Sequence, residues 1–308
     1  MTRSEPSRMH VTVRVPATVA NLGPGFDILA LALQQQNEIE AWSEPDGGGV
    51  SIDPGPESPR ELRDPARNLI TRAFVAACAT GGVAPPCARI TCRNAIPFGR
   101  GLGSSAAAAL SGVLAANAMA RLGWDAQRVI AQAAEIEGHP DNVAAAMLGG
   151  MVICLRDGPV TQVAVPDELR AVLFLPDVEM STEAARRVVP SSFSREEAIY
   201  NASRCALLVA AMLTGRLELL GEAMRDRWHQ PARSELMPHV PRLIDAALAA
   251  GAHGACLAGA GPSVLALCTG GTEAVVSAMA AAARLAGVDG HPVTHPVRNF
   301  GARVDLAP

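Results

Sequence analysis

The sequence predicts an α+β fold in which helices cover sheets on one side, and two kinds of segment indicate it. Alternating, β-branched runs such as residues 11–16 are typical of strands. Alanine-rich runs such as residues 104–122 are typical of helices, because alanine has the highest helix propensity. A length of 308 residues favours about two domains. A change of composition near residues 157–167 places the boundary there, which gives domains over residues 8–160 and 161–304.

The expected strands are β-branched or apolar runs that turn residues interrupt. They are residues 11–16, 37–42, 88–93, 160–165, 171–175, 256–257, 264–268 and 293–304. Residues 17–33 are expected to form a loop that runs into apolar sequence. Residues 45–65 are rich in Pro, Gly and Asp, and are expected to form a surface excursion.

The expected helices combine helical spacing with start and stop residues. They are residues 68–80, 104–122, 125–138, 182–189, 196–214, 217–227, 240–250 and 273–286. Gly81 and Gly123 follow two of the helix ends, where glycine allows the backbone conformation that stops a helix. Ser104 and Asp125 are the expected N-caps, because their side-chain oxygens can accept hydrogen bonds from the first free N–H groups.

Composition excludes several classes of protein. Hydrophobic residues make up 49% of the chain and charged residues 18%, which is typical of a globular protein and not of a disordered one. The net charge of −4 offers no general attraction to nucleic acid or to an anionic membrane, so any anion site must be local. Residues 101–120 and 250–271 lack formal charge, but Ala, Gly and Ser dominate them and they do not resemble membrane spans.

The use of cysteine and lysine narrows the chemistry further. The seven cysteines are scattered and form no C-x-x-C pair, which argues against a disulfide framework or a zinc site. The first residues, MTRSEPSRMHVTVRV, contain no apolar signal segment, so we expect a cytoplasmic protein. The chain contains no lysine, which excludes a lysine base, a Schiff base and a lysine phosphate clamp.

The stretch PFGRGLGSSAAAAL, residues 97–110, is a candidate anion site. Three glycines occupy every second position from Gly99 to Gly103, immediately before a predicted helix. Glycine allows positive φ, and a helix N-terminus presents free N–H groups that can bind a phosphate without lysine. Ser104 and Ser105 add hydroxyl groups. The stretch is neither a Walker A loop, which requires G-K-[ST], nor a G-x-G-x-x-G fingerprint. The structural alternative is a tight turn before an ordinary helix.

Four sequence blocks resemble the GHMP kinases, a family that includes galactokinase, homoserine kinase and mevalonate kinase. P-x-x-x-G-L-G-S-S-A-A at residues 97–107 resembles their ATP-binding motif. VPATVANLGPGFDILALAL at residues 15–33 resembles their substrate motif in the form that homoserine kinases carry, and EGHPDNVAAAMLGG at residues 137–150 is also similar to homoserine kinases. LAGAGPSVLAL at residues 257–267 resembles their third, glycine-rich motif. The blocks follow the family order and span nearly the whole chain.

The resemblance implies a two-domain GHMP kinase fold. Its N-terminal domain is similar to ribosomal protein S5 domain 2, and its C-terminal domain is ferredoxin-like. The cofactors implied are ATP and Mg²⁺, with the ATP phosphates on the glycine loop. The implied ATP-binding residues are Asn68, Pro97, Phe98, Gly99, Arg100, Gly101, Leu102, Gly103, Ser104, Ser105, Ala106 and Ala107. Ser105 would also bind Mg²⁺, and Asn68 would lie on the adenine side.

A second magnesium ligand is left open between two carboxylates. Mg²⁺ prefers oxygen ligands, and Glu135 and Glu137 both precede the HPDN sequence. They are two positions apart on a predicted helix, about 200° around its axis, so only one can face the site. The register against longer family members favours Glu135. Helical geometry favours Glu137, which lies closer to the face of Val129, Ile130 and Ala133.

The resemblance also implies a site for L-homoserine. Its residues are Asn21, Asp27, His139, Asn142, Thr182, Arg186, Arg233 and Gly259. Asp27 suits an amino group, and Asn142 would lie near the accepting hydroxyl. Thr182 and the two arginines would hold the α-carboxylate, which arginine binds through two parallel hydrogen bonds. Arg187 is the alternative to its neighbour Arg186.

The implied reaction is phosphorylation of the homoserine hydroxyl by ATP, on the route to threonine. Homoserine kinases are thought to lack a strong base, so the hydroxyl would attack the γ-phosphate directly while the loop amides stabilise the developing charge. Asn142, Asp27 and Ser105 are the expected catalytic residues. The alternatives are another GHMP small-molecule kinase, such as the archaeal type of shikimate kinase, and a non-catalytic ligand sensor. A homodimer is left open, and neither nucleic acid nor a membrane is expected as a partner.

Overall fold

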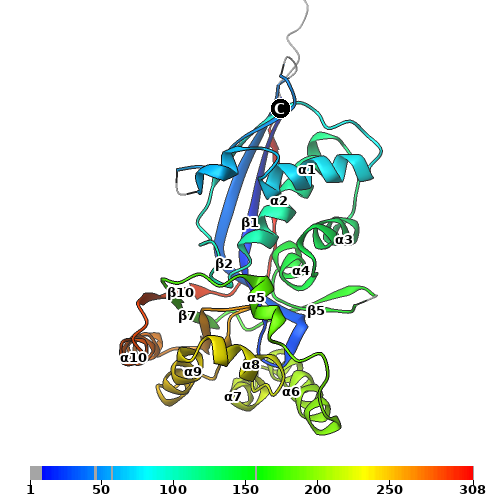
Figure 1. Cartoon of the computed structure of the whole chain (residues 1–308). Coiled ribbons are helices and arrows are strands. Elements are labelled where there is room, and N and C mark those ends of the chain that lie inside the picture. Colours follow the sequence, from blue (N-terminus) through cyan, green and yellow to red (C-terminus); the bar gives the residue numbers. More distant parts are fainter. Residues whose placement is uncertain (1–8, 45–46, 57, 157, 308) are drawn as a thin grey trace, which may run out of the picture.

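The computed structural model describes residues 9–44, 47–56, 58–156 and 158–307. Within these ranges, seven strands form a first sheet in the order β11-β1-β2-β4-β3, with β5 pairing to β2 and β6 to β5. The strands are β1 (His10–Asn21), β2 (Gly25–Ser43), β3 (Val50–Asp53), β4 (Ala88–Arg93), β5 (Met151–Cys154), β6 (Val160–Val163) and β11 (Arg303–Ala307). The sheet forms the upper half of the molecule in Figure 1.

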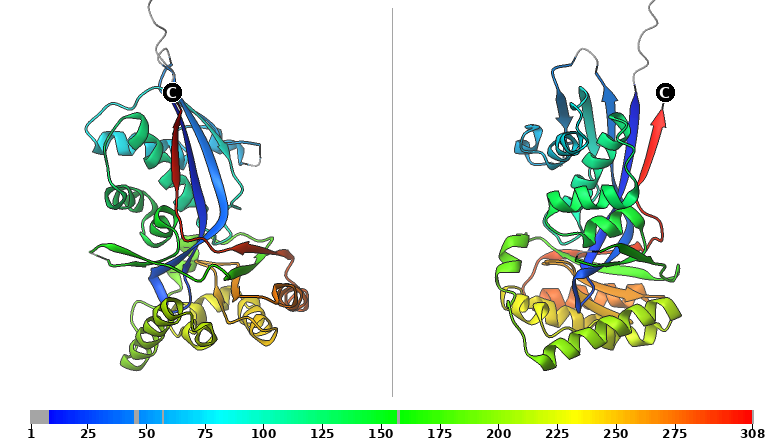
Figure 2. Two further views of the ribbon diagram at one scale, coloured as in Figure 1. Left: turned by 180° about the vertical axis from the view of Figure 1, so that it is seen from behind. Right: turned by 90° about the vertical axis from the view of Figure 1, so that its right-hand side faces the viewer.

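Helices cover one face of the first sheet (Figures 1 and 2). They are α1 (Leu69–Thr80), α2 (Ser104–Met119), α3 (Ala126–Glu137) and α4 (Asp141–Leu148), and a 3₁₀ turn, η1 (Arg60–Arg63), precedes them. Helix α2 packs against α1, α3, α4 and β1, and its small alanine side chains let these elements approach from several sides. None of the helices in the described ranges is both long and apolar enough to cross a membrane.

A second sheet lies in the lower half of Figure 1. In the described part of the chain it has four strands, β7 (Arg170–Pro176), β8 (Gly254–Leu257), β9 (Val264–Cys268) and β10 (Gly290–Pro296). Their spatial order is β10-β7-β9-β8, and all neighbours are antiparallel. If the four strands are numbered along the chain, their order across the sheet is 4-1-3-2. Helices follow the first and the third strand, which gives the βαββαβ arrangement of a ferredoxin-like domain.

The helices of the lower half lie between β7 and β8, except for the last one. They are α5 (Thr182–Arg187), α6 (Arg195–Thr214), α7 (Leu220–Ala223), α8 (His229–Leu236), α9 (His239–Ala249) and α10 (Thr272–Leu285), with a 3₁₀ turn, η2 (Leu217–Leu219). Val172 and Phe174 on one face of the sheet pack with α9 and α10. Leu173 and Leu267 on the opposite face join the core of the upper half, so the second sheet is buried on both faces.

Residues 17–33, expected to form a loop, belong to a long hairpin of β1 and β2. Left-handed backbone conformations at Asn21, Leu22 and Gly23 reverse the chain, which is why the segment has the composition of a turn. The tip of the hairpin descends into the lower half (Figure 2), where Gly23 lies against the backbone of Met224. This geometry carries the polar residues of the tip to the junction between the two halves.

Two other expectations are corrected by the structure. Residues 217–227 contain the short elements η2 and α7 and not one helix, and α8 was not expected. The segment 293–304 is not one strand, because β10 pairs with β7 whereas β11 crosses back to pair with β1. The domain limits 8–160 and 161–304 stay a proposal, with β11 as a part of the first sheet; residue 8 lies outside the described residues.

Candidate active site

A cavity of about 410 Å³ lies where the two halves meet. The hairpin tip, the glycine loop, the turn between α3 and α4, the start of α5 and the β8–β9 loop all contribute to its wall. The predicted site residues in this wall are Asn21, Asp27, Asn68, Pro97, Phe98, Gly99, Arg100, Gly101, Leu102, Gly103, Ser104, Ser105, Glu137, His139, Asn142, Thr182, Arg186, Arg233 and Gly259. The predicted residues that do not line the cavity are Glu135, Ala106 and Ala107.

The glycine loop has a left-handed backbone at every second residue. The φ angles of Gly99, Gly101 and Gly103 are 64°, 76° and 69°. Loops in which left-handed residues alternate in this way expose successive N–H groups to an anion. The side chain of Arg100 extends from the loop and donates to the carbonyl oxygens of Pro176 and Val178, just beyond β7. Arg100 therefore anchors the loop to the lower half of the molecule.

Helix α2 begins at Ser104 with Gly103 as its N-cap, so the expectation that Ser104 caps the helix is wrong. Because a glycine has no side chain for capping, the first N–H groups of α2 stay free for a ligand. The N–H of Ala107 is already used, since it donates to the carbonyl oxygen of Gly103 at 2.8 Å. The side chains of Ala106 and Ala107 are buried in the core. These two alanines thus support the loop from within.

We expect Gly101→Ala to destabilise the protein by about 2–5 kcal/mol. An added Cβ atom would collide with the carbonyl oxygen of Ala258. Left-handed φ costs an alanine roughly 1–2 kcal/mol, and overpacking adds about 1–3 kcal/mol. Gly123→Ala is the matched control, because Gly123 has a φ of 71° and no atom lies within 4 Å of its Cβ position. Urea unfolding of both variants measures the difference, and equal losses of stability would contradict the close approach at Gly101.

Helix α3 brings a carboxylate to the start of α2. Asp125 caps α3 and left-handed Gly138 ends it, as expected. The Ser105 hydroxyl donates to Oε1 of Glu137 at 2.5 Å, and burial raises the pKa of the Glu137 carboxyl group. Glu135 is exposed and lies outside the cavity wall. Of the two alternatives, the geometry favours Glu137.

The side chains around Ser105 offer oxygen ligands of the kind that Mg²⁺ prefers. Within the described residues, no group of three or more His, Cys, Asp and Glu side chains could hold a metal ion. Mg²⁺ commonly takes only one or two carboxylates, and nucleotide phosphates supply further oxygen ligands. A cation near Glu137 would also stabilise the charge that burial disfavours. The hydroxyl of Ser105 and the carboxylate of Glu137 therefore fit an Mg²⁺ ion that arrives with a nucleotide.

The hairpin tip carries Asn21 and Asp27 into the cavity. Asp27 has a φ of 59°, and its backbone N–H donates to Oδ1 of Asn21 at 3.1 Å. Both terminal nitrogens of Arg186 donate to the Asp27 carboxylate, at 2.5 and 2.9 Å. Arg187 is exposed and pairs with Glu183 at 2.9 Å, four residues earlier on α5. Helix α5 therefore directs Arg186, and not its neighbour, to the cavity.

Arg233 reaches the cavity from α8 although it is only 1% exposed. Its Nε donates to the carbonyl oxygen of Ala185 and its Nη1 to that of Gly259, both at 3.0 Å. Gly259 also accepts from Nδ2 of Asn21 at 2.9 Å. Burial lowers the pKa of Arg233 to about 10, so the guanidinium stays charged at neutral pH. None of the described residues accepts a hydrogen bond from Nη2, which is left for a ligand.

The turn between α3 and α4 presents His139 to the cavity, and the first turn of α4 presents Asn142. Nδ1 of His139 lies 3.3 Å from Oδ1 of Asp141, and this carboxylate raises the pKa of His139. The Thr18 hydroxyl donates to Oδ1 of Asn142 at 2.8 Å, which leaves the amide N–H groups of Asn142 for a ligand. Thr18 was not among the expected site residues, although it belongs to the same sequence block as Asn21 and Asp27.

Asn68 uses both ends of its side chain within the protein. Its Oδ1 accepts from the N–H of Ile70 at 2.9 Å and caps α1, and its Nδ2 donates to the carbonyl oxygen of Leu62 at 2.8 Å. Asn68 therefore shapes the cavity wall through α1 and η1, and its contact with adenine stays a prediction.

Comparison with known proteins agrees with this geometry. The model of the GHMP kinases N terminal domain matches residues 68–150, and that of the GHMP kinases C terminal matches residues 208–285. A homoserine kinase from Synechococcus sp. is 41% identical over 265 residues, which cover 84% of this chain and 86% of the relative. The chain belongs to the homoserine kinase family of the GHMP kinases. A homoserine kinase from Thermus thermophilus is 43% identical over 265 residues and covers 85% and 88% of the two chains.

Solved structures place the homoserine kinase family fold over the whole chain. The crystal structure of homoserine kinase from Cytophaga hutchinsonii has a TM-score of 0.86 at 30% identity and covers 99% of both chains. The galactokinase from Lactococcus lactis, at 14% identity and a TM-score of 0.75, covers 96% and 95% and shares the fold alone. The expected two-domain GHMP kinase fold is confirmed.

Proposed function

We propose that this chain transfers the γ-phosphoryl group of ATP to the hydroxyl of L-homoserine, forming O-phospho-L-homoserine in threonine biosynthesis. Its relatives at about 40% identity over most of their length are homoserine kinases. The observation that carries the proposal is the pair of Asp27 and Arg186, which lies in the same cavity wall as the glycine loop.

The Asp27–Arg186 pair is the charge complement of an amino acid. A free amino acid carries an ammonium and a carboxylate on one carbon, and Asp27 and Arg186 offer the opposite charges side by side. Binding would replace the Asp27–Arg186 ion pair by two ion pairs with the substrate. The ammonium would pair with Asp27, and the carboxylate would pair bidentately with Arg186. Arg233 adds a second, buried cation for the carboxylate, and Thr182 adds a hydroxyl. Neutral acceptor alcohols, which lack both charges, could not make this exchange.

The glycine loop is proposed to hold the nucleotide phosphates. Free N–H groups from Gly101 to Ala106, together with the positive end of α2, favour an anion there without lysine. Asn68 is proposed to lie on the adenine side. Ser105 and Glu137 would hold Mg²⁺, which neutralises phosphate charge when it is bound.

Direct attack by the substrate hydroxyl is the proposed route, because few groups near the site suit a base. The chain contains no lysine, and Asp27 is neutralised by Arg186. The pKa of His139 is raised beside Asp141, which favours the protonated ring and so opposes its use as a base. Asn142 would orient the hydroxyl through its free amide, and the loop N–H groups would bind the developing charge.

An acceptor panel tests the proposed function. Purified protein with ATP and Mg²⁺ is supplied with homoserine, shikimate or mevalonate, and ADP release is coupled to NADH oxidation. We expect kcat/KM for homoserine to exceed that for the other acceptors by at least roughly 100-fold, since neither of them carries the ammonium group that Asp27 would bind. Turnover with shikimate or mevalonate but not with homoserine would overturn the proposal. Binding of ATP and homoserine without turnover would indicate the non-catalytic sensor instead.

The assembly state is a separate question, and a homodimer stays open. Light scattering coupled to size-exclusion chromatography, which measures the molar mass in solution, tests it.

A further inference from the structure

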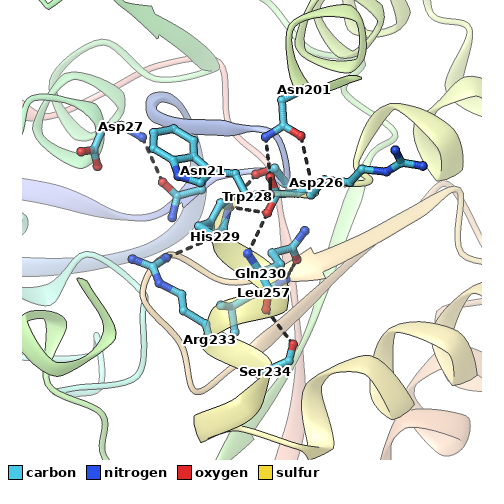
Figure 3. Close-up of polar contacts among 12 residues, drawn as sticks. Asn21, Asp27, Asn201, Asp226, Trp228, His229, Gln230, Arg233, Ser234 and Leu257 are labelled. Carbon is cyan, nitrogen blue, oxygen red and sulfur yellow. Dashed lines mark hydrogen bonds and ion pairs between the residues drawn. The ribbon is translucent and has the colours of Figure 1, made fainter. Parts of the chain in front are cut away.

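A buried polar network lies directly behind the proposed amino-acid site (Figure 3). At its centre is His229, the first residue of α8, whose side chain is 0% exposed. Its Nε2 lies 2.7 Å from the carbonyl oxygen of Gly23, at the hairpin tip. Its Nδ1 lies 3.2 Å from Nη1 of Arg233. One imidazole ring thus joins the tip that carries Asn21 and Asp27 to the buried arginine.

The two partners determine the tautomer of His229. The carbonyl oxygen of Gly23 can only accept a hydrogen bond, so Nε2 must carry the proton. The Arg233 guanidinium can only donate, so Nδ1 must be unprotonated and accept. Burial lowers the pKa of His229 to about 4, so the neutral ring that satisfies both bonds persists at neutral pH.

The neighbouring Asp226 belongs to the network without bonding to the ring, and its charge raises the pKa of His229 by less than burial lowers it. Its Oδ2 is 3.6 Å from Nε2 of His229, beyond a hydrogen bond. Its carboxylate accepts instead from Nδ2 of Asn201 at 2.5 Å and from the backbone N–H groups of Trp228 and Gln230 at 3.0 and 2.7 Å. Asp226 is therefore a fixed, buried negative charge near the buried Arg233, which it helps to keep protonated.

The network closes on the cavity through Gly259. Its carbonyl oxygen accepts from Nη1 of Arg233 and from Nδ2 of Asn21. Arg233 and the hairpin tip are thus joined twice, once through Gly259 in the cavity wall and once through His229 behind it. In this network the bond to Gly23 fixes the hairpin tip, and the bond to Arg233 fixes the guanidinium.

We propose that His229 is a positioning residue for the amino-acid substrate. Its bond to Gly23 holds the hairpin tip, which would bind the ammonium, and its bond to Arg233 holds the guanidinium that would bind the carboxylate. The inference rests on the proposed function, because it takes the acceptor to be an amino acid. It predicts that the two hydrogen bonds of the ring serve the two ends of the substrate separately.

Two substitutions separate these hydrogen bonds. In His229→Gln the amide nitrogen can occupy the Nε2 position and still donate to Gly23, but the acceptor for Arg233 is lost. In His229→Asn the amide oxygen can occupy the Nδ1 position and still accept from Arg233, but the donor to Gly23 is lost. We expect each variant to raise KM for homoserine by roughly 10-fold and to leave KM for ATP within about two-fold. The control is His295→Gln. His295 is a half-buried histidine on β10 and does not line the cavity.

Truncated competitive inhibitors then report each end of the site. 4-Hydroxybutyrate has the carboxylate without the ammonium, and 3-aminopropanol has the ammonium without the carboxylate. The inhibition constant of 4-hydroxybutyrate should rise roughly 10-fold in His229→Gln and stay near wild type in His229→Asn. The inhibition constant of 3-aminopropanol should show the reverse. A residue that served only stability would change both inhibitors alike in both variants, and that result would overturn the proposal.

The outcomes also distinguish this inference from the proposed function. If the wild-type chain does not phosphorylate homoserine, the proposed function fails whatever the variants do. If it does, and both variants keep KM for homoserine within two-fold, the positioning role fails alone. Should the variants not fold, ¹⁵N NMR of the wild-type histidine rings replaces them. A neutral ring protonated at Nε2 is expected, with both ring nitrogens shifting on homoserine binding, and an unchanged ring or an Nδ1–H tautomer would overturn the proposal.

Discussion

Glu137→Gln is expected to lower kcat by roughly 100- to 1000-fold, which is the usual effect of removing one group that stabilises transition-state charge. Glu137 accepts from Ser105 at 2.5 Å at the start of α2, where the phosphates are proposed to lie. The neutral amide of the introduced glutamine would be a poor ligand for the Mg²⁺ that is proposed to neutralise those phosphates. Steady-state assays at several Mg²⁺ concentrations measure the loss, and the Mg²⁺ needed for half-maximal rate should rise as well.

Glu135→Gln is the matched control for this prediction. Glu135 lies on the same helix two residues earlier, but it is exposed and does not line the cavity. Its replacement removes the same charge but from an exposed position outside the cavity. We therefore expect kcat to stay within about two-fold of wild type. If Glu135→Gln lost more activity than Glu137→Gln, the assignment of Glu137 would be wrong.

The stability of Glu137→Gln separates lost chemistry from lost folding. Burial raises the pKa of Glu137 above 4.5, so the ionised carboxylate disfavours the folded state without ligand at every pH above that raised value. The amide removes this penalty. The variant should therefore unfold at pH 7 at a temperature no lower than wild type does, and the two should converge as the pH falls below about 4.5. Thermal scans at both pH values test it.

Local sequence was enough to predict the glycine loop and most helices. The loop depends on three glycines and a following alanine run, and helix α3 depends on Asp125 and Gly138 at its ends. These features act within a few residues, which is the range that spacing and capping rules describe. The choice between Glu135 and Glu137, by contrast, depends on how α3 is turned against α2, and that is a tertiary contact.

Residues 17–33 of the hairpin and helix α8 could not be predicted from local pattern. Most of residues 17–33 are buried, so this segment lacks the alternation that reveals a half-exposed strand. Helix α8 begins HQPARS, which is polar, yet His229, Gln230 and Arg233 are its buried residues because partners from distant parts of the chain satisfy them. The bonds from His229 to Gly23 and from Arg186 to Asp27 join residues 206 and 159 positions apart.

Arg186→Ala is expected to raise KM for homoserine by roughly 30- to 150-fold and to leave KM for ATP within about two-fold. The guanidinium is as exposed as the Asp27 carboxylate that it pairs with, and both of its terminal nitrogens can donate to a carboxylate. Loss of a charged, bidentate contact costs about 2–3 kcal/mol, which corresponds to this change. Competition binding of homoserine, with ATP present at saturation, measures the same loss without turnover.

Arg187→Ala is the matched control, because it removes the same side chain from the next position of α5. Arg187 pairs with Glu183 at the surface, and exposed pairs of this kind contribute little, so KM for homoserine should not change. Loss of Arg186 removes the protein partner of the Asp27 carboxylate. Asp27 can still bind the ammonium group of a ligand. The penalty in Arg186→Ala should therefore be confined to ligands with a carboxylate and be absent for 3-aminopropanol. A similar penalty for both ligand types would mean that Arg186 maintains the hairpin tip and does not contact the substrate.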